Sequence, residues 1–134
     1  MKKVIFICTG NACRSQMAEG FLKHYKSNEY KVYSAGTNPT KVHPAAIKVM
    51  SELNINISNH TSDHMNDFLD KKIDIVITVC DDANQKCPIF PESQKSIHWS
   101  IEDPFINWSD DENLLDPYRK CRDAIKKRIK EFIN

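Results

Sequence analysis

The feature that most constrains this chain is a loop near the N-terminus that joins an apolar run to a helical pattern. The run Val4–Cys8 is short, continuous and typical of a buried strand, and it ends at the turn-forming residues Thr9-Gly10-Asn11. Met17, Phe21 and Tyr25 then follow at helical spacing on one face. The sequence therefore predicts a strand, a tight loop and a helix, which is how many α/β folds begin.

The same alternation of strand and helix patterns continues along the chain. Strands are expected at 31–35, 73–79 and 96–100, and a second helix opens at His43-Pro44 with proline at its first position. The last helix carries an apolar stripe of Leu114, Tyr118, Cys121, Ile125, Ile129 and Phe132. This pattern predicts an α/β fold in which residues 1–134 form a single domain, with a small four-stranded parallel sheet flanked by helices.

Charge and composition exclude several classes of function. Nineteen lysines and arginines nearly balance eighteen acidic residues and are scattered, so the sequence shows no patch for nucleic acid or for an acidic membrane surface. No apolar run approaches the roughly 20 residues that cross a bilayer. The start turns polar too soon for a signal peptide, so we expect a cytoplasmic protein, and its small size suits a monomer. Five cysteines in a reducing compartment indicate catalysis, redox work or metal binding rather than structural disulfides.

The loop after the first strand has the composition of an oxyanion site. Cys8 and Arg14 are separated by five residues, and the segment leads into a helix N-terminus, where backbone N–H groups can surround an anion. The expected binding residues are Thr9, Gly10, Asn11, Ala12, Cys13, Arg14 and Ser15. The helix and Arg14 should lower the pKa of Cys8 and make it a nucleophile. The nucleotide-binding pattern Gly-x-x-x-x-Gly-Lys is absent, so this phosphate-binding loop (P-loop) is of another kind.

Two further cysteines follow the expected third strand. Cys80 comes directly after it, at the sheet edge where Cys8 also ends a strand, and Cys87 lies seven residues further on. Seven residues span about 10 Å along a helix, so a disulfide between the two requires the segment to rearrange. Its aspartates and prolines make partial unwinding easy. The alternative is that Cys80 is a core residue and Cys87 an incidental thiol.

Asp103 follows the fourth expected strand in the sequence Glu-Asp-Pro-Phe. A carboxylic acid above the anion loop can protonate a leaving oxygen and later take a proton back. An Asp-Pro pair after a strand is otherwise simply a turn. Asp116-Pro117 has the same pair at the start of the last helix, where Asp116 is expected to be the N-cap and to have no chemical role.

The segments CTGNACRSQMAE, YSAG, HPAA, TSD and EDP together resemble the low-molecular-weight protein tyrosine phosphatase superfamily, and in particular its thioredoxin-coupled arsenate reductase branch. The resemblance implies a four-stranded parallel sheet and a nucleophile at Cys8. It also implies reduction of arsenate to arsenite through a Cys8 adduct, a disulfide cascade over Cys80 and Cys87, and thioredoxin as the electron donor. No cofactor is obligatory, but a potassium ion is implied at Asn11, Glu19, Ser34 and Asp63.

Two other functions stay open at this point. The first is a phosphatase that hydrolyses aryl phosphates with Cys8, Arg14 and Asp103. Where the phosphatases carry tyrosine after the Asp-Pro pair, this chain has Phe105-Ile106-Asn107-Trp108, which still allows a hydrophobic wall. The second is a non-catalytic module in which the loop only holds an anion.

The remaining cysteines and the histidines are not expected to carry chemistry. Cys13 should matter through its backbone, and Cys121 as a small apolar residue of the last helix. The cysteine spacings do not match a zinc site. Four histidines are expected to be either surface or capping residues, namely His43, His60, His64 and His98. His24 is expected to be exposed on the first helix.

Overall fold

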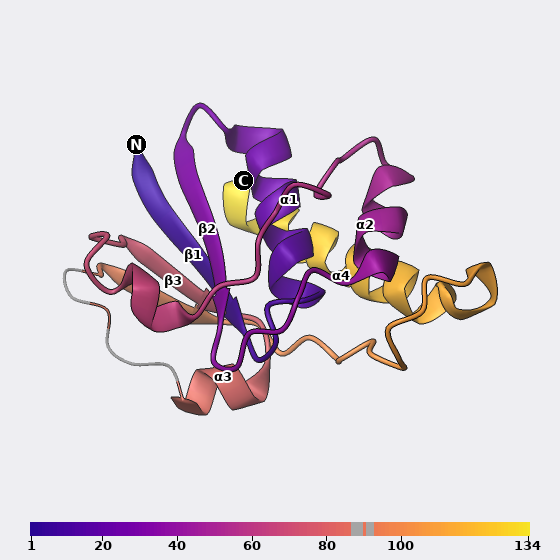
Figure 1. Ribbon diagram of the computed structural model, residues 1–134. Helices are drawn as coiled ribbons and strands as arrows, with labels where there is room; N and C mark the ends of the chain where they lie inside the picture. Colours follow the sequence, from indigo (N-terminus) through magenta and orange to yellow (C-terminus); the bar gives the residue numbers. More distant parts are fainter. Residues whose placement is uncertain (87–89, 91–92) are drawn as a thin grey trace.

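In the computed structural model, which describes residues 1–86, 90 and 93–134, four parallel strands form one sheet. They are β1 (Lys2–Cys8), β2 (Tyr30–Gly36), β3 (Ile75–Thr78) and β4 (Lys95–His98), and their order in the sheet is β2-β1-β3-β4. The predicted four-stranded parallel sheet is confirmed. Because all the strands run in one direction, their carboxyl ends meet at one edge, which lies near α3 in Figure 1.

Three helices gather on one side of this sheet (Figure 1). They are α1 (Arg14–Lys26), α2 (Pro44–Ser51) and α4 (Asp116–Ile133). Shorter helices lie in the connections: η1 (Met65–Phe68), α3 (Asp81–Lys86) and η2 (Glu112–Leu114). Among the described residues, no helix has both the length and the apolar character needed to span a membrane.

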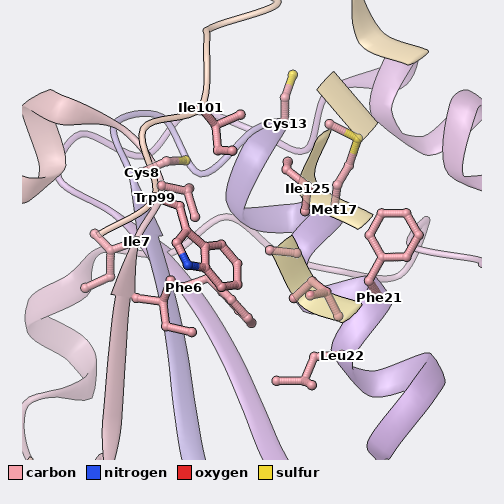
Figure 2. Packing of buried hydrophobic residues seen from close by; sticks show 14 of the residues in the cluster. Phe6, Ile7, Cys8, Cys13, Met17, Phe21, Leu22, Trp99, Ile101 and Ile125 are labelled. Atoms are coloured by element: carbon pink, nitrogen blue, oxygen red, sulfur yellow. The ribbon is translucent and has the colours of Figure 1, made fainter. Parts of the chain in front are cut away.

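The core forms between the sheet and the helices α1 and α4. Residues 4–7 of β1 have no exposed surface, as expected for a central strand that is covered on both faces. Figure 2 shows Phe6 of β1 and Trp99 facing the apolar side chains of the two helices, and the two ring centroids are 5.9 Å apart. Ile125 and Ile129 from the predicted apolar stripe are fully buried, so the stripe docks α4 on this core.

The structure corrects the expected start of the last helix. Leu115, not Asp116, occupies the N-cap position, and the helix has no side-chain cap. Asp116 is the first helical residue, and its carboxylate accepts a hydrogen bond from Arg119 at 2.9 Å. Leu114 belongs to η2, which runs directly into α4, so no extended cap residue separates them. The expected strands at 73–79 and 96–100 are also shorter or shifted, at Ile75–Thr78 and Lys95–His98.

Gly36, the last residue of β2, lies against the loop that follows β1. A Cβ atom at this position would lie 2.5 Å from the carbonyl oxygen of Thr9 and 3.0 Å from the backbone nitrogen of Asn11. Since backbone atoms cannot rotate away, we expect Gly36→Ala to lower the free energy of unfolding by about 2–3 kcal/mol in urea denaturation. Gly10→Ala is the control, because its Cβ would first meet the Thr40 hydroxyl, at 3.3 Å, and should cost under about 1 kcal/mol. Equal losses in the two variants would contradict this account.

Candidate active site

The loop between β1 and α1 is held from outside by the segment 37–43. Four backbone N–H groups of this segment, those of Thr37, Asn38, Thr40 and His43, donate at 2.8–3.1 Å to the carbonyl oxygens of Cys8, Thr9, Gly10 and Ala12, respectively. In a trans peptide the C=O and the following N–H point in opposite directions. The N–H groups that follow these carbonyls therefore face the inside of the loop, and the N–H of Asn11 indeed lies 3.2 Å from Cys8 Sγ. Inward N–H groups of this kind are the arrangement that an anion-binding nest requires, so anion binding at this loop stays a prediction that the geometry allows.

A cavity of about 210 Å³ opens at this loop. Its lining residues are Cys8, Thr9, Gly10, Ala12, Cys13, Arg14, Thr40, Asp103, Phe105 and Trp108. Two of the expected binding residues, Asn11 and Ser15, are fully buried and lie outside this lining. They connect instead to the sulfur of Cys8. Asn11 Nδ2 donates to Ser15 Oγ at 2.7 Å, and Ser15 Oγ lies 2.9 Å from Cys8 Sγ.

The protonation of Cys8 differs from the sequence-based expectation. Burial raises the pKa of the Cys8 thiol, while the hydrogen bond to Ser15 and the charge of Arg14 lower it without cancelling the effect of burial. Cys8 is only 2 % exposed, and the guanidinium of Arg14 contacts the Ile101 carbonyl and Asp103. The expected net lowering of the pKa was wrong for this arrangement, because the sequence does not reveal how deeply the strand end is buried.

This pKa direction predicts how Cys8 reacts with an alkylating reagent. Only the thiolate is nucleophilic, and a raised pKa keeps the thiol protonated until the pH passes that value. We expect the rate at which iodoacetamide labels Cys8 to be low at pH 7 and to keep rising through the alkaline range, as measured by peptide mass spectrometry. A rate that already reaches its plateau below pH 7 would contradict the burial argument.

Arg14 and Asp103 meet at the mouth of the cavity. Arg14 Nη1 donates to the carbonyl oxygen of Ile101 at 3.0 Å, and Arg14 Nη2 lies 3.6 Å from Asp103 Oδ2. The Asp103 side chain is 59 % exposed, so this ion pair is screened by solvent. Both groups line the same cavity as Cys8. The structure thus brings together the expected nucleophile, anion-binding cation and carboxylic acid, although they come from two distant parts of the chain.

Cys80 lies beside the same loop. The backbone ladder between β1 and β3 continues to the bond from Val79 N–H to the Ile7 carbonyl, which places Cys80 just beyond the end of β3. Its sulfur is buried, lies 3.3 Å from Thr9 Oγ1 and accepts a hydrogen bond from the Ala83 N–H in α3. Cys87 lies outside the described residues, so its expected pairing with Cys80 stays a prediction.

The other two cysteines are buried, as expected for Cys121, a small apolar residue of the last helix; Cys13 was expected to matter through its backbone. Cys13 and Cys121 are both buried, and burial raises the pKa of each thiol, that of Cys121 to about 12. Figure 2 shows the Cys13 side chain at the start of α1, pointing away from Cys8. Within the described part of the chain, no cluster of histidine, cysteine and acidic residues is arranged to hold a metal ion.

The residues implied for potassium form one hydrogen-bonded cluster next to the loop. Asn11 Nδ2 donates to Ser34 Oγ at 3.0 Å, and the Ser34 hydroxyl donates to Glu19 Oε1 at 2.6 Å. Asp63 joins through its backbone, since its N–H donates to Asn11 Oδ1 at 2.9 Å. The ammonium of Lys23 pairs with the other oxygen of Glu19. A protein cation therefore already lies beside the carboxylate.

The Asn11 side chain is hydrogen-bonded to Ser15, Ser34 and Asp63. The backbone of Asn11 adopts a left-handed conformation, with φ at 49°. Asn11→Ala removes three side-chain hydrogen bonds, two of them buried, and a residue that tolerates this conformation, so we expect the free energy of unfolding to fall by about 3 kcal/mol. Asn54→Ala is the matched control, because Asn54 has a similar φ of 62° but is exposed, and it should cost about 1 kcal/mol. Urea denaturation measures both. Similar losses in the two variants would show that backbone strain alone matters here.

The histidines only partly follow the sequence-based expectation. His24 is exposed, and His64 caps η1 by accepting from Asn66 N–H, as expected. His43 caps α2, which was one of the two expected roles, and it is fully buried. His60 is also largely covered, with its ring 3.0 Å from Gln16 Oε1, and burial lowers its pKa. His98 is exposed and lies 2.9 Å from Asp81 Oδ1.

Some residues of the site were not identified from the sequence. Thr40 lines the cavity, and the segment 37–43 fixes the loop, but neither has a recognisable motif. The hydrophobic wall considered for 105–108 is present, since Phe105 and Trp108 both line the cavity with ring centroids 5.2 Å apart. The wall also packs on His43, a residue distant in the sequence, and the spacing of residues within 105–108 does not reveal such contacts.

Comparison with known proteins agrees with this geometry. Residues 3–134 match the family described as low molecular weight phosphotyrosine protein phosphatase. The arsenate reductase of Halalkalibacterium halodurans is 47% identical over 132 residues, which cover 98% of this chain and 95% of that protein. A solved arsenate reductase in its oxidized state is 36% identical with a TM-score of 0.84, over 99% of this chain and 97% of the other.

A second solved structure adds a named reductant. The thioredoxin-dependent arsenate reductase of Corynebacterium glutamicum is 31% identical with a TM-score of 0.76, and the match covers 98% of this chain and 60% of that one. The family match and these identities extend over nearly the whole chain. This chain therefore belongs to the low molecular weight phosphotyrosine protein phosphatase family.

Proposed function

We infer that this protein is an arsenate reductase, which converts arsenate to arsenite. The observation that carries this function is the second thiol beside the anion loop, with Cys80 Sγ at 3.3 Å from Thr9 Oγ1. Hydrolysis of a phosphate ester needs one thiol and an acid, whereas reduction of arsenate needs two electrons and hence a second thiol. The similarity to arsenate reductases over nearly the full chain supports the same conclusion.

In the proposed first step, arsenate binds in the nest between Thr9 and Ser15, where Arg14 and the inward N–H groups hold its oxygens. The sulfur of Cys8 attacks arsenic and one As–O bond breaks. Asp103 delivers a proton to the leaving oxygen, and the proton lost by the Cys8 thiol restores the carboxylic acid through solvent, so one water is released. The product is a thiol-arsenate adduct in which arsenic is not yet reduced.

Reduction follows when the thiolate of Cys80 attacks the sulfur of Cys8. A Cys8–Cys80 disulfide forms, the S–As bond breaks, and its electron pair stays on arsenic, which leaves as arsenite. Cys87 then attacks Cys80, which frees Cys8 and produces a Cys80–Cys87 disulfide. The two electrons come from the thiols of Cys80 and Cys87, and partial unwinding of the segment between them would bring these two sulfurs together.

We propose thioredoxin as the dithiol that returns these electrons, which is supported by the similarity to the thioredoxin-dependent enzyme of C. glutamicum. We also propose that the protein acts as a monomer in the cytoplasm, where free thiols stay reduced. The test of function couples the protein to thioredoxin, thioredoxin reductase and NADPH, and follows NADPH oxidation on addition of arsenate. Oxidation that needs both arsenate and thioredoxin supports the proposal, and none above background contradicts it.

A second function, hydrolysis of aryl phosphates, is favoured by one observation. Phe105 and Trp108 form an aromatic wall beside Cys8, Arg14 and Asp103, where an aryl ring could pack. Release of 4-nitrophenol from its phosphate ester measures this activity. A rate that exceeds arsenate reduction and is unchanged in Cys80→Ser would make phosphatase the main function. Tight phosphate binding without turnover of any substrate would instead indicate an anion-binding module.

A potassium ion at Asn11, Glu19, Ser34 and Asp63 is a further proposal. The oxygen-bearing side chains suit a hard monovalent cation. It would place positive charge next to Asn11, which is hydrogen-bonded to Ser15 beside Cys8. Such an ion has to compete with the ammonium of Lys23, which already pairs with Glu19. The thermal midpoint of unfolding in potassium chloride, compared with choline chloride at equal ionic strength, tests this proposal. A midpoint that is higher in potassium chloride supports binding, and equal midpoints contradict it.

A further inference from the structure

His43 lies between the anion loop and the segment that carries the acid and the aromatic wall. Its backbone N–H donates to the carbonyl oxygen of Ala12 at 3.0 Å, on the outer side of the loop. Its imidazole Nε2 lies 2.6 Å from the carbonyl oxygen of Asn107, two residues after Phe105. One buried residue thus contacts both sides of the cavity.

The hydrogen bonds around His43 fix its tautomer. Nδ1 accepts from the N–H of Ala45 at 2.9 Å, so in the neutral ring the proton is on Nε2 and is donated to Asn107. Burial lowers the pKa of His43, partly opposed by the Asn107 carbonyl, and the nearby charges are Lys41 and Asp110. A protonated ring would direct a second N–H toward the N–H of Ala45. The neutral form is therefore the one that fits this position.

Tyr118 of α4 completes the contact. Its hydroxyl accepts from the N–H of Ile106 at 3.2 Å, donates to the Asn107 carbonyl at 3.2 Å and lies 3.1 Å from His43 Nε2. The rings of Trp108 and Phe105 also pack on His43, with centroid distances of 5.0 and 5.6 Å. The segment 105–108 has no regular secondary structure, so its position depends on side-chain contacts such as these.

We propose that His43 and Tyr118 are positioning residues for arsenate reduction, which hold the segment 103–108 so that Asp103 faces the anion bound beside Cys8. Asp103 itself is exposed and is bonded to the N–H of Phe105 at 3.0 Å, so its position follows that of the segment. The inference rests on the proposed reaction, because it assigns to these residues an effect on the step that uses Asp103.

The test uses His43→Asn and Tyr118→Phe in single-turnover reactions with arsenate. Asparagine can still cap α2 but is too short to reach Asn107, and phenylalanine removes only the hydroxyl. We expect each variant to slow adduct formation about 10-fold while the affinity for inorganic phosphate, which the loop provides, changes less than about 3-fold. His64→Asn is the matched control, since His64 caps η1 in the same way but has no contact with the segment 103–108 among those that the structure gives.

A double-mutant cycle with Asp103→Asn distinguishes positioning from general destabilisation. If His43 acts through Asp103, His43→Asn should have no further effect on the rate in the Asp103→Asn background. An unchanged rate in His43→Asn alone, or a full additive loss in the double variant, would overturn the proposal. Failure of the wild type to produce arsenite would contradict the proposed function instead.

Amide hydrogen exchange at Ile106 tests the contact without any reaction. The Ile106 N–H should be protected in the wild type and in His64→Asn, and it should exchange at least about 10-fold faster in Tyr118→Phe. Equal exchange in all three proteins would show that the hydroxyl does not hold the segment.

Discussion

Cys8→Ser is expected to abolish arsenate reduction, with a loss of at least about 10⁴-fold in turnover. A serine hydroxyl at the same buried position cannot form the thiol adduct, because the adduct requires the sulfur of Cys8. The nest remains, because it is built from backbone groups that the segment 37–43 holds in place. We therefore expect inorganic phosphate to bind Cys8→Ser within about 3-fold of the wild-type affinity, as measured by isothermal titration calorimetry.

Cys13→Ser is the matched control for this prediction. Cys13 belongs to the same loop, is also buried and borders the same cavity, but its side chain points away from Cys8 (Figure 2). Its turnover should stay within about 3-fold of the wild type, because only its backbone contributes to the nest. Comparable losses in Cys8→Ser and Cys13→Ser would mean that the loop tolerates no change and that Cys8 has no special role.

The fold could be predicted from the sequence because its main signals are local. The continuous apolar run of β1 indicates a buried strand, and the helical spacing of the apolar stripe on α4 indicates one buried helix face. Parallel topology then places the ends of β1 and β3 at one edge, which is why Cys8 and Cys80 could be expected near each other. The predicted bounds of β3 and β4 were less accurate. Apolar residues just outside a strand are buried like those within it, so an apolar pattern does not mark where the strand ends.

The site was less predictable where tertiary contacts decide its chemistry. The pKa of Cys8 depends on how completely the end of β1 is buried, and the sequence carries no measure of that burial. His43 looked like a helix cap, which it is, but its second contact is with Asn107, 64 residues away. Asp116 matched an N-cap pattern, yet η2 runs directly into α4 and leaves no extended residue to cap.

Cys80→Ser is expected to stop the reaction after the first step. Arsenate can still form the adduct with Cys8, but the described residues offer no second thiol beside Thr9 to attack the Cys8 sulfur, so arsenite release should fall at least about 10³-fold. Cys121→Ser is the control, because Cys121 is a buried thiol on α4 whose pKa is raised to about 12, and it should turn over normally. Intact-mass analysis after arsenate addition should show an adduct that accumulates in Cys80→Ser and not in Cys121→Ser.

A thiol count on the wild type decides whether the cascade goes to completion. With arsenate and no external reductant, the fully reduced protein should lose two of its five free thiols, and peptide mapping should find them as a Cys80–Cys87 disulfide. In Cys87→Ser the bond should instead be trapped between Cys8 and Cys80, after a single release of arsenite. Steady-state turnover of Cys87→Ser with thioredoxin at the wild-type rate would rule out the three-thiol order. Because Cys8 is the last residue of β1 and Cys80 lies just beyond the neighbouring strand β3, we expect the first disulfide to need little rearrangement. We expect the second disulfide to require α3 to open, and this opening to expose the bond to the reductant.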